Sequence, residues 1–489
     1  MDINTDTHNE RTALTNQTDL TNPKDNWLLP PMVGEISNRG RGTSSFELNH
    51  SYDIVILCEP KFKITPLICM ITSETKFEQE HKFTLEPMGP TRIILSVPHT
   101  GIFQLRWYQM RGFHEPMRIE IFRHEIVVAD EPNRLIFVSC DLLEADTAPE
   151  DSMWTRMQRE ITPNNQTYLI HVGDQAYMDK VFNDCVELSR TQGQNDVTAT
   201  NILMAFGRRY CETWMPHHLI SAAVSNYNLW DDHDLKNDMT LTQDDISSDE
   251  KYVRDIAVHA YIKYQESLHL NKHEILSRYS WYKRINQILI LAVERTSCVI
   301  SVSQILKSID DLTSTAPINR LILCFASAPI PPPRGPYGSL YRHMTGDKGT
   351  SETSKFWSAY DLSDLYRGLF VWLSKDAKRE VLVVGGDLHF GTYGIVRHNG
   401  RQISVIISSP ITNQPNTERW LAAKGMAGTH YISNDNTNPI TFETIASRAR
   451  RCYAVVNLDR LPMHISMHYS THKLPQSNIK YFKTLLSFK

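Results

Sequence analysis

Short segments with a strand-like hydrophobic pattern fill the chain from about residue 51 to residue 128. Turn signals such as Met88-Gly89-Pro90 separate them every dozen residues or so, and no helical period of useful length interrupts them. Evenly spaced short strands bounded by turns are typical of an all-β sandwich. The segments that carry this pattern are 52–58, 91–98, 102–109 and 117–122.

The pattern changes after Asp130-Glu131-Pro132. Unbroken apolar runs now alternate with longer stretches of helical spacing, among them 249–270 and 362–376. Because runs without alternation indicate strands covered on both faces, we expect a layered α/β domain here. The segment 328–357, which is rich in Pro and Gly, is predicted to be a long loop. The apolar runs are 135–139, 168–172, 288–293, 321–326, 381–384 and 403–407.

These patterns divide the chain into three parts. Residues 1–48 are predicted to be a mobile tail, because the opening sequence is rich in Asn, Thr and Asp and cannot contribute a core. Residues 49–130 would form the β-sandwich domain, and residues 131–489 the α/β domain. The N-terminus has neither the cationic start nor the apolar core of a secretory signal. We therefore expect a protein that is cytoplasmic, or exported without an N-terminal signal peptide.

Composition narrows the function classes. Hydrophobic residues make up 41% and charged residues 22% of the chain, which excludes a disordered or fibrous protein. The net charge of −4 offers no global field for binding nucleic acid. No apolar run approaches the ~20 residues of a transmembrane helix. The eight cysteines include no C-x-x-C pair, so most are expected to be reduced, buried thiols.

Reactive side chains directly follow several of the predicted strands. Since the carboxyl ends of strands line the ligand crevice of an α/β sheet, we expect these side chains to form one composite site. They are Cys140 after the first run, Asp174 and Tyr177 after the second, Glu294 and Arg295 after the third, Asp387 and His389 after the fifth, and Ser408 and Ser409 after the sixth.

A further cluster combines three carboxylates and one histidine between Asp231 and Asp234. Mutual repulsion among these carboxylates favours a site that holds cations. A solvated loop, or a helix N-terminus stabilised by its dipole, is the alternative.

Taken in order, these motifs resemble the calcineurin-like metallophosphatase superfamily and, within it, the alkaline phosphatase D (PhoD-like) family. The resemblance covers residues 130 to about 415. It implies a layered α/β/β/α metallophosphatase-type sandwich preceded by a smaller all-β sandwich domain, and a phosphate ester as substrate. The motifs are Ser139-Cys140, G-D-Q-x-Y at 173–177, W-D-D-H-D at 230–234 and G-D-x-H-F at 386–390.

The resemblance and ligand chemistry together imply a two-metal site, in which the metals activate a water and hold the phosphoryl oxygens. Thiolate and phenolate donors suit Fe³⁺ at the first position, and all-oxygen ligands suit Ca²⁺ or Mg²⁺ at the second. Asp174 is expected to bridge the two. The first metal would take Cys140, Asp174, Tyr177 and His389. The second would take Asp174, Asp232 and Asp387, with Asp231 as a further candidate.

Two residues are candidates for catalysis rather than metal binding. His233 is suited to protonate or hydrogen-bond the leaving oxygen, and Arg295 to clamp the substrate phosphate. Structural roles are the alternatives: a hydrogen-bonding His233, a buried ion pair at Arg295, a core aromatic at Tyr177 and an inert thiol at Cys140.

The sequence therefore predicts a metal-dependent phosphoesterase that hydrolyses phosphodiesters, phosphomonoesters or both. The alternative from another class is a phosphatase-fold protein that binds phosphorylated partners without turnover, for instance a host-directed factor.

Overall fold

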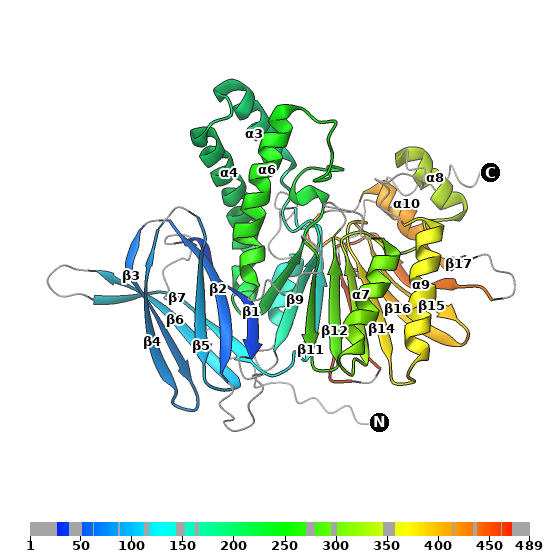
Figure 1. Ribbon diagram of the computed structural model, residues 1–489, viewed down its shortest axis with the longest axis horizontal. Helices are drawn as coiled ribbons and strands as arrows, with labels where there is room; N and C mark the ends of the chain where they lie inside the picture. The colour runs from blue at the N-terminus through cyan, green and yellow to red at the C-terminus, as the bar shows by residue number, and fades with distance from the viewer. Residues whose placement is uncertain are drawn as a thin grey trace.

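Four β-sheets and the helices packed on them make up the part of the chain that the structure describes (Figure 1). The computed structural model describes residues 27–38, 51–61, 63–86, 89–111, 117–142, 152–161, 166–269, 279–294, 301–345, 357–413, 416–433, 438–460 and 462–471.

The first two sheets form the expected all-β sandwich. One has the strand order β1-β2-β5 and the other β4-β3-β6-β7, with antiparallel neighbours throughout. Ile54 and Leu95 from the first sheet share one apolar core with Leu105 and Trp107 from the second. The strands are β1 (Trp27–Asn38), β2 (Tyr52–Pro60), β3 (Ile64–Ser73), β4 (Glu78–Leu85), β5 (Thr91–Val97), β6 (Gly101–Arg111) and β7 (Met117–Val128).

The prediction of a mobile tail over residues 1–48 is wrong for residues 27–38. These residues form β1, which pairs antiparallel with β2. The Pro30-Pro31 pair argues against a strand, but β1 is the edge strand of its sheet and its register shifts between Leu29 and Met32, where a bulge accommodates the prolines. The other residues of the predicted tail lie outside the described residues.

The remaining two sheets build the α/β domain. The five-stranded sheet has the order β10-β9-β8-β19-β20, and the eight-stranded sheet has the order β11-β12-β13-β14-β16-β15-β18-β17. The strands are β8 (Arg134–Val138), β9 (Thr167–Val172), β10 (Ser225–Leu229), β11 (Trp281–Ile285), β12 (Ile288–Val293), β13 (Arg320–Phe325), β14 (Glu380–Gly385), β15 (Gly391–His398), β16 (Arg401–Ile407), β17 (Gly428–Tyr431), β18 (Thr441–Arg448), β19 (Cys452–Asn457) and β20 (His464–Tyr469).

The two sheets pack face to face, with helices on their outer faces. Phe137 and Ile170 of the five-stranded sheet share a core with Ile322 and Val384 of the eight-stranded sheet. Helix α2 covers the outer face of the five-stranded sheet, and α7 and α9 cover the outer face of the eight-stranded sheet. These layers confirm the α/β/β/α sandwich. The helices are α2 (Met153–Glu160), α5 (His218–Ser221), α7 (Val302–Ser314), α8 (Gly335–Thr345), α9 (Ala359–Ser374) and α10 (Thr417–Gly425).

A helical unit stands above the sheets in Figure 1. It has its own apolar core, to which Leu29 and Met32 of β1 also belong. The expected helix over 249–270 is found here as α6, whereas the predicted loop at 328–357 contains the helix α8. The elements of the unit and its neighbours are α3 (Asp179–Gln192), α4 (Asp196–Trp214), α6 (Ser248–Tyr264) and the short helices η3 (Met215–His217), η4 (Asp232–Asp234) and η5 (Glu266–Leu268).

Buried polar contacts join the sandwich to the rest of the protein. Glu35 of β1 forms an ion pair with Lys283 of β11, and the side chain of each is at least nine-tenths buried. Asn226 Nδ2 of β10 donates to the carbonyl oxygen of Val33 at 2.7 Å. Strand β1 therefore belongs to the sandwich by pairing and to the α/β domain by packing.

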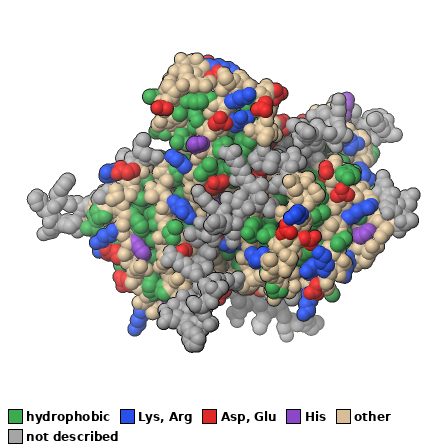
Figure 2. Space-filling model, in the orientation of Figure 1, with side chains coloured by type: hydrophobic (Ala, Val, Ile, Leu, Met, Phe, Trp, Pro, Cys, Tyr) green, Lys and Arg blue, Asp and Glu red, His purple; other side chains and the backbone are tan. Residues whose placement is uncertain are grey.

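The distribution of surface charge and the state of the cysteines agree with what the composition predicts. On the face that Figure 2 shows, acidic and basic side chains of the described residues are interspersed, as the near balance of 51 basic and 55 acidic residues leads one to expect. All seven cysteines within the described ranges are buried and outside disulfides. None of the described helices combines the length and apolar character needed to cross a bilayer.

Removing β1 should unfold the protein. A deletion of residues 1–38 removes five buried apolar side chains, each contributing roughly 1.5–3 kcal/mol, a sum comparable with the ~5–15 kcal/mol of a whole domain. These side chains are Trp27, Leu29, Met32, Val33 and Ile36. We expect an insoluble protein or one without a cooperative thermal transition. A deletion of residues 1–24 keeps β1 and should melt like the full chain, and equal melting temperatures for both deletions would contradict this role of β1.

Candidate metal centre

The predicted site lies where strand ends from both sheets of the α/β domain meet. Strands β8, β9 and β10 run parallel in one sheet, and β13, β14 and β16 run parallel in the other. In each sheet, the carboxyl ends of these parallel strands therefore lie along the same edge. The two edges touch at Gly386, where an added Cβ would lie 2.1 Å from the carbonyl oxygen of Val172. Only glycine permits this approach.

The backbone at the site is held in an unusual conformation. Eight described residues other than glycine have a positive φ, and four of them are predicted ligands. Left-handed backbone is disfavoured for residues with a Cβ and is concentrated at functional sites, because surrounding structure must enforce it. The four are Cys140 (φ 57°), Asp174 (φ 54°), Asp387 (φ 62°) and His389 (φ 53°).

The first predicted ligand group is brought together by the fold. Ligand atoms of Cys140, Asp174 and His389 all lie within 4.8 Å of one another. The Tyr177 hydroxyl lies 3.3 Å from Asp174 Oδ2 and 2.9 Å from His389 Nε2. Four residues from three strand ends thus surround one point, as expected for a metal with thiolate, phenolate, carboxylate and imidazole ligands.

The second group contains Asp231 and not Asp232. Carboxylate oxygens of Asp174, Asp231 and Asp387 lie within 4.8 Å of one another, and all three residues are buried. Asp232 belongs to neither group, and its Oδ2 accepts a hydrogen bond from the backbone N–H of Asp238 at 2.7 Å. Asp231 lies two residues after β10 and caps η4, which begins at Asp232, and its side chain lies against Gly173, the residue before Asp174.

Asp174 is common to both groups, as a bridging ligand must be. Gly173 before it has φ 91°, and a Cβ there would lie 2.8 Å from the Cβ of Asp231. The glycine of the G-D motif therefore allows the two carboxylate-bearing loops to come into contact.

Electrostatics at the centre favour a bound cation. Burial and the carboxylates of Asp174 and Asp387 raise the pKa of the Cys140 thiol well above its usual value. Burial, Cys140 and Asp174 likewise raise the pKa of the Tyr177 hydroxyl. A positive charge among these groups would reverse both shifts by favouring thiolate and phenolate. The donor set therefore fits metal ions better than it fits an apolar or anionic group.

Asp234, the last residue of the acidic cluster, supports the centre from behind. Its carboxylate accepts hydrogen bonds from the backbone N–H groups of Asp174, Ala176 and Asp231 at 3.0–3.1 Å. It thus ties the loop after β9 to the loop after β10. The W-D-D-H-D motif at 230–234 pointed to Asp234, but the sequence alone could not show whether this carboxylate binds a metal or supports the loops.

Two further residues near the first group were not assigned a role from the sequence. Ser409 Oγ lies 3.0 Å from Cys140 Sγ and accepts from the backbone N–H of His389. Asn413 Nδ2 donates to the Tyr177 hydroxyl at 3.3 Å and lies 3.4 Å from His389 Nδ1. The position of Ser409 after the apolar run 403–407 pointed to the site, whereas Asn413 lies outside every motif found in the sequence.

His233 lies beside the first group and is oriented by a carboxylate. Its Nδ1 lies 2.8 Å from Asp179 Oδ2, and its ring centroid lies 4.4 Å from that of Tyr177. Burial lowers the pKa of His233, but the charge of Asp174 and the hydrogen bond with Asp179 outweigh it and raise this pKa to about 10. Arg295, the other catalytic candidate, lies outside the described residues.

Comparisons with known proteins support the fold that this site occupies. No family model matches the chain, and no curated protein sequence does. Among solved structures, that of PhoD aligns over 95% of this chain and 99% of its own at 12% identity, with a TM-score of 0.57. The purple acid phosphatase PPD1 from yellow lupin (Lupinus luteus) seeds aligns over 91% of this chain and 72% of its own at 8% identity, with a TM-score of 0.52. The resemblance to PhoD and to the metallophosphatases that the motifs indicated is therefore confirmed as a likeness of fold.

Proposed function

We propose that the protein is a metal-dependent phosphoesterase, PhoD-like in its use of two metals, acting on phosphodiesters, phosphomonoesters or both. The observation that carries the proposal is the pair of ligand groups that share Asp174. One group offers a thiol and an imidazole, and the other offers only carboxylates. This asymmetry supports Fe³⁺ at the first group and Ca²⁺ or Mg²⁺ at the second.

Each residue has a defined task in this proposal. Cys140, Tyr177 and His389 would hold one metal, Asp231 and Asp387 the other, and Asp174 both. When bound, the two metals neutralise phosphate charge and lower the pKa of an attacking water.

The leaving oxygen needs a proton or a hydrogen bond, and His233 is the described residue best placed to give it. Asp179 accepts from Nδ1 at 2.8 Å, which directs Nε2 away from Asp179. Asp179 is itself fixed, because its Oδ1 accepts from the backbone N–H of Asn237 at 2.8 Å. Asp179 is thus a positioning residue for His233.

Metal content should respond differently to the shared ligand and to an unshared one. Asp174→Asn removes a ligand from both groups, so we expect loss of both metals and of phosphoesterase activity. Cys140→Ser should lose the Fe³⁺ alone and keep the carboxylate-site metal. Elemental analysis of protein purified without added metal measures this. Two metals retained by Asp174→Asn would contradict the bridging assignment.

The neighbouring carboxylates Asp231 and Asp232 offer a matched pair of variants. Asp231→Asn should lower affinity for the second metal by at least about tenfold, because a charged ligand becomes a neutral one. Asp232→Asn has the same change in charge one residue away and should keep the metal. Calcium and magnesium titrations followed by calorimetry test this, and the reverse order would restore Asp232 as the ligand.

His233→Ala should lose activity in proportion to how poorly the leaving group departs. We expect about a 10²- to 10⁴-fold loss on an alkyl phosphodiester, the usual contribution of general-acid assistance, and a much smaller loss on a nitrophenyl ester. Asp179→Asn should also lose more activity on the alkyl phosphodiester than on the nitrophenyl ester, but by a smaller factor. Both variants should retain both metals.

Equal losses on both esters would assign His233 to phosphate positioning instead. A metal-loaded wild-type protein that binds phosphorylated ligands and turns over neither ester would favour the alternative of a binding protein.

A further inference from the structure

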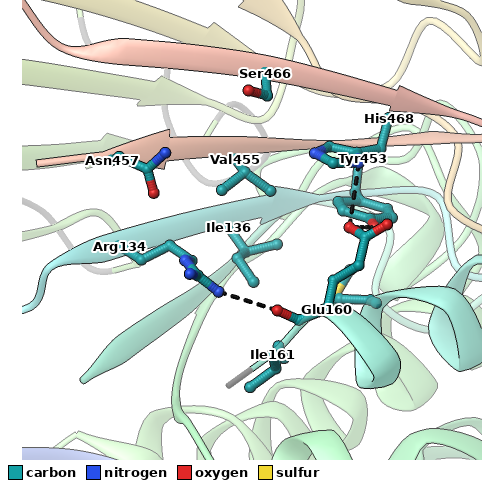
Figure 3. A pocket seen from close by; sticks show the side chains of 10 residues that line it. Arg134, Ile136, Glu160, Ile161, Tyr453, Val455, Asn457, Ser466 and His468 are labelled. Atoms are coloured by element: carbon teal, nitrogen blue, oxygen red, sulfur yellow. Dashed lines mark hydrogen bonds and ion pairs between the residues drawn. The ribbon is translucent and has the colours of Figure 1, made fainter. Parts of the chain in front are cut away.

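A cavity of about 250 Å³ lies on the outer face of the five-stranded sheet, beside the end of α2 (Figure 3). Its volume is just below the ~300–1,000 Å³ of typical small-molecule sites, so it suits a ligand with about one ring. Strands β8, β19 and β20 form one wall. Its lining includes Arg134, Ile136, Glu160, Val455, Asn457 and Ser466.

The strand register explains why these side chains share one face. Ile136 pairs with Val455, which pairs with Ser466, and Arg134 pairs with Asn457 in the next row. Alternate residues of a strand point to the same side, so the two rows project together. The cavity therefore has the apolar side chains of Ile136 and Val455 beside the polar side chains of Arg134 and Asn457.

Arg134 supplies a positive charge to the cavity. Its Nη1 donates to the carbonyl oxygen of Glu160 at 3.3 Å. Among the described residues no carboxylate forms an ion pair with Arg134, and its buried Nε has no hydrogen-bond partner. Asn457 and Ser466 add an amide and a hydroxyl on the neighbouring strands.

The acidic residue in the lining is already compensated. The Glu160 carboxylate accepts from Arg156 Nε at 3.1 Å and from the Tyr453 hydroxyl, and it lies 3.2 Å from His468 Nδ1. Figure 3 shows the Glu160 carboxylate turned toward Tyr453 and His468, on the side away from the Arg134 guanidinium. The charge left for a ligand is therefore the positive charge of Arg134.

We propose that this cavity binds a small organic anion with one apolar ring or short chain. Its carboxylate or phosphonate-type head would pair with Arg134, because the planar guanidinium presents two parallel donors to such oxyanions. Its apolar body would lie against Ile136 and Val455, opposite Met157 of α2.

This site is separate from the metal centre. Arg134 is the first residue of β8, whereas Cys140 lies two residues beyond its last, and the five residues of this strand alone span about 16 Å. Binding in the cavity should therefore not depend on the metal ligands.

Ligand-observed NMR titrations with benzoate, phenylphosphonate and benzyl alcohol test the proposal. We expect saturable binding of at least one anion, and at least about tenfold weaker binding of benzyl alcohol, because a charge-assisted hydrogen bond is lost. Arg134→Gln should weaken anion binding to a similar degree. Arg159→Gln, an equal change in charge on exposed α2 surface, should leave it unchanged.

Two more variants keep the test decisive. Asn457→Asp places a carboxylate beside Arg134 and should abolish anion binding even if Arg134→Gln does not fold. Asp174→Asn should lose phosphoesterase activity but keep anion binding, which separates this site from the metal centre. The proposal is overturned if neither anion binds, if Arg134→Gln and Asn457→Asp both bind like the wild type, or if Asp174→Asn abolishes binding.

Discussion

The structure depends on bringing several acidic groups into contact inside the protein. Asp174, Asp231 and Asp387 are buried within 4.8 Å of one another, and Cys140 approaches the same Asp174. Desolvation and like-charge repulsion both oppose this arrangement, so the surrounding fold must impose it. The apolar core between the two central sheets imposes it, because that core fixes the strands from which these residues emerge.

The supporting contacts show how the constraint is met locally. Backbone N–H groups of two loops converge on Asp234, and Ser409 holds both Cys140 and the backbone of His389. At four predicted ligand positions, each within four residues of a strand end, the backbone is left-handed. The predicted ligands are thus placed by strand ends and their hydrogen bonds rather than by long loops.

The sequence predicted what depends on local order and missed what depends on tertiary packing. Unbroken apolar runs identified β8, β9, β12, β13, β14 and β16, and most residues of the two candidate ligand groups follow these runs. Strand β10, with the polar sequence SNYNL, and strand β1, with its two prolines, carry no such signal and form because neighbours cover them. The choice between Asp231 and Asp232 likewise depends on where β10 ends.

The sandwich domain takes part in this arrangement, although none of its described residues belongs to either ligand group. Asn226 of β10 donates not only to Val33 of β1 but also to the carbonyl oxygens of Ser221 and Val224. Strand β1 thereby packs against the strand that ends just before Asp231, while the Glu35–Lys283 pair ties β1 to β11 of the other sheet. A buried ion pair that spans two domains favours one relative placement over others, because any shift would leave a charge unpaired. The sandwich therefore helps to fix the position of β10 and of Asp231, which lies two residues after it.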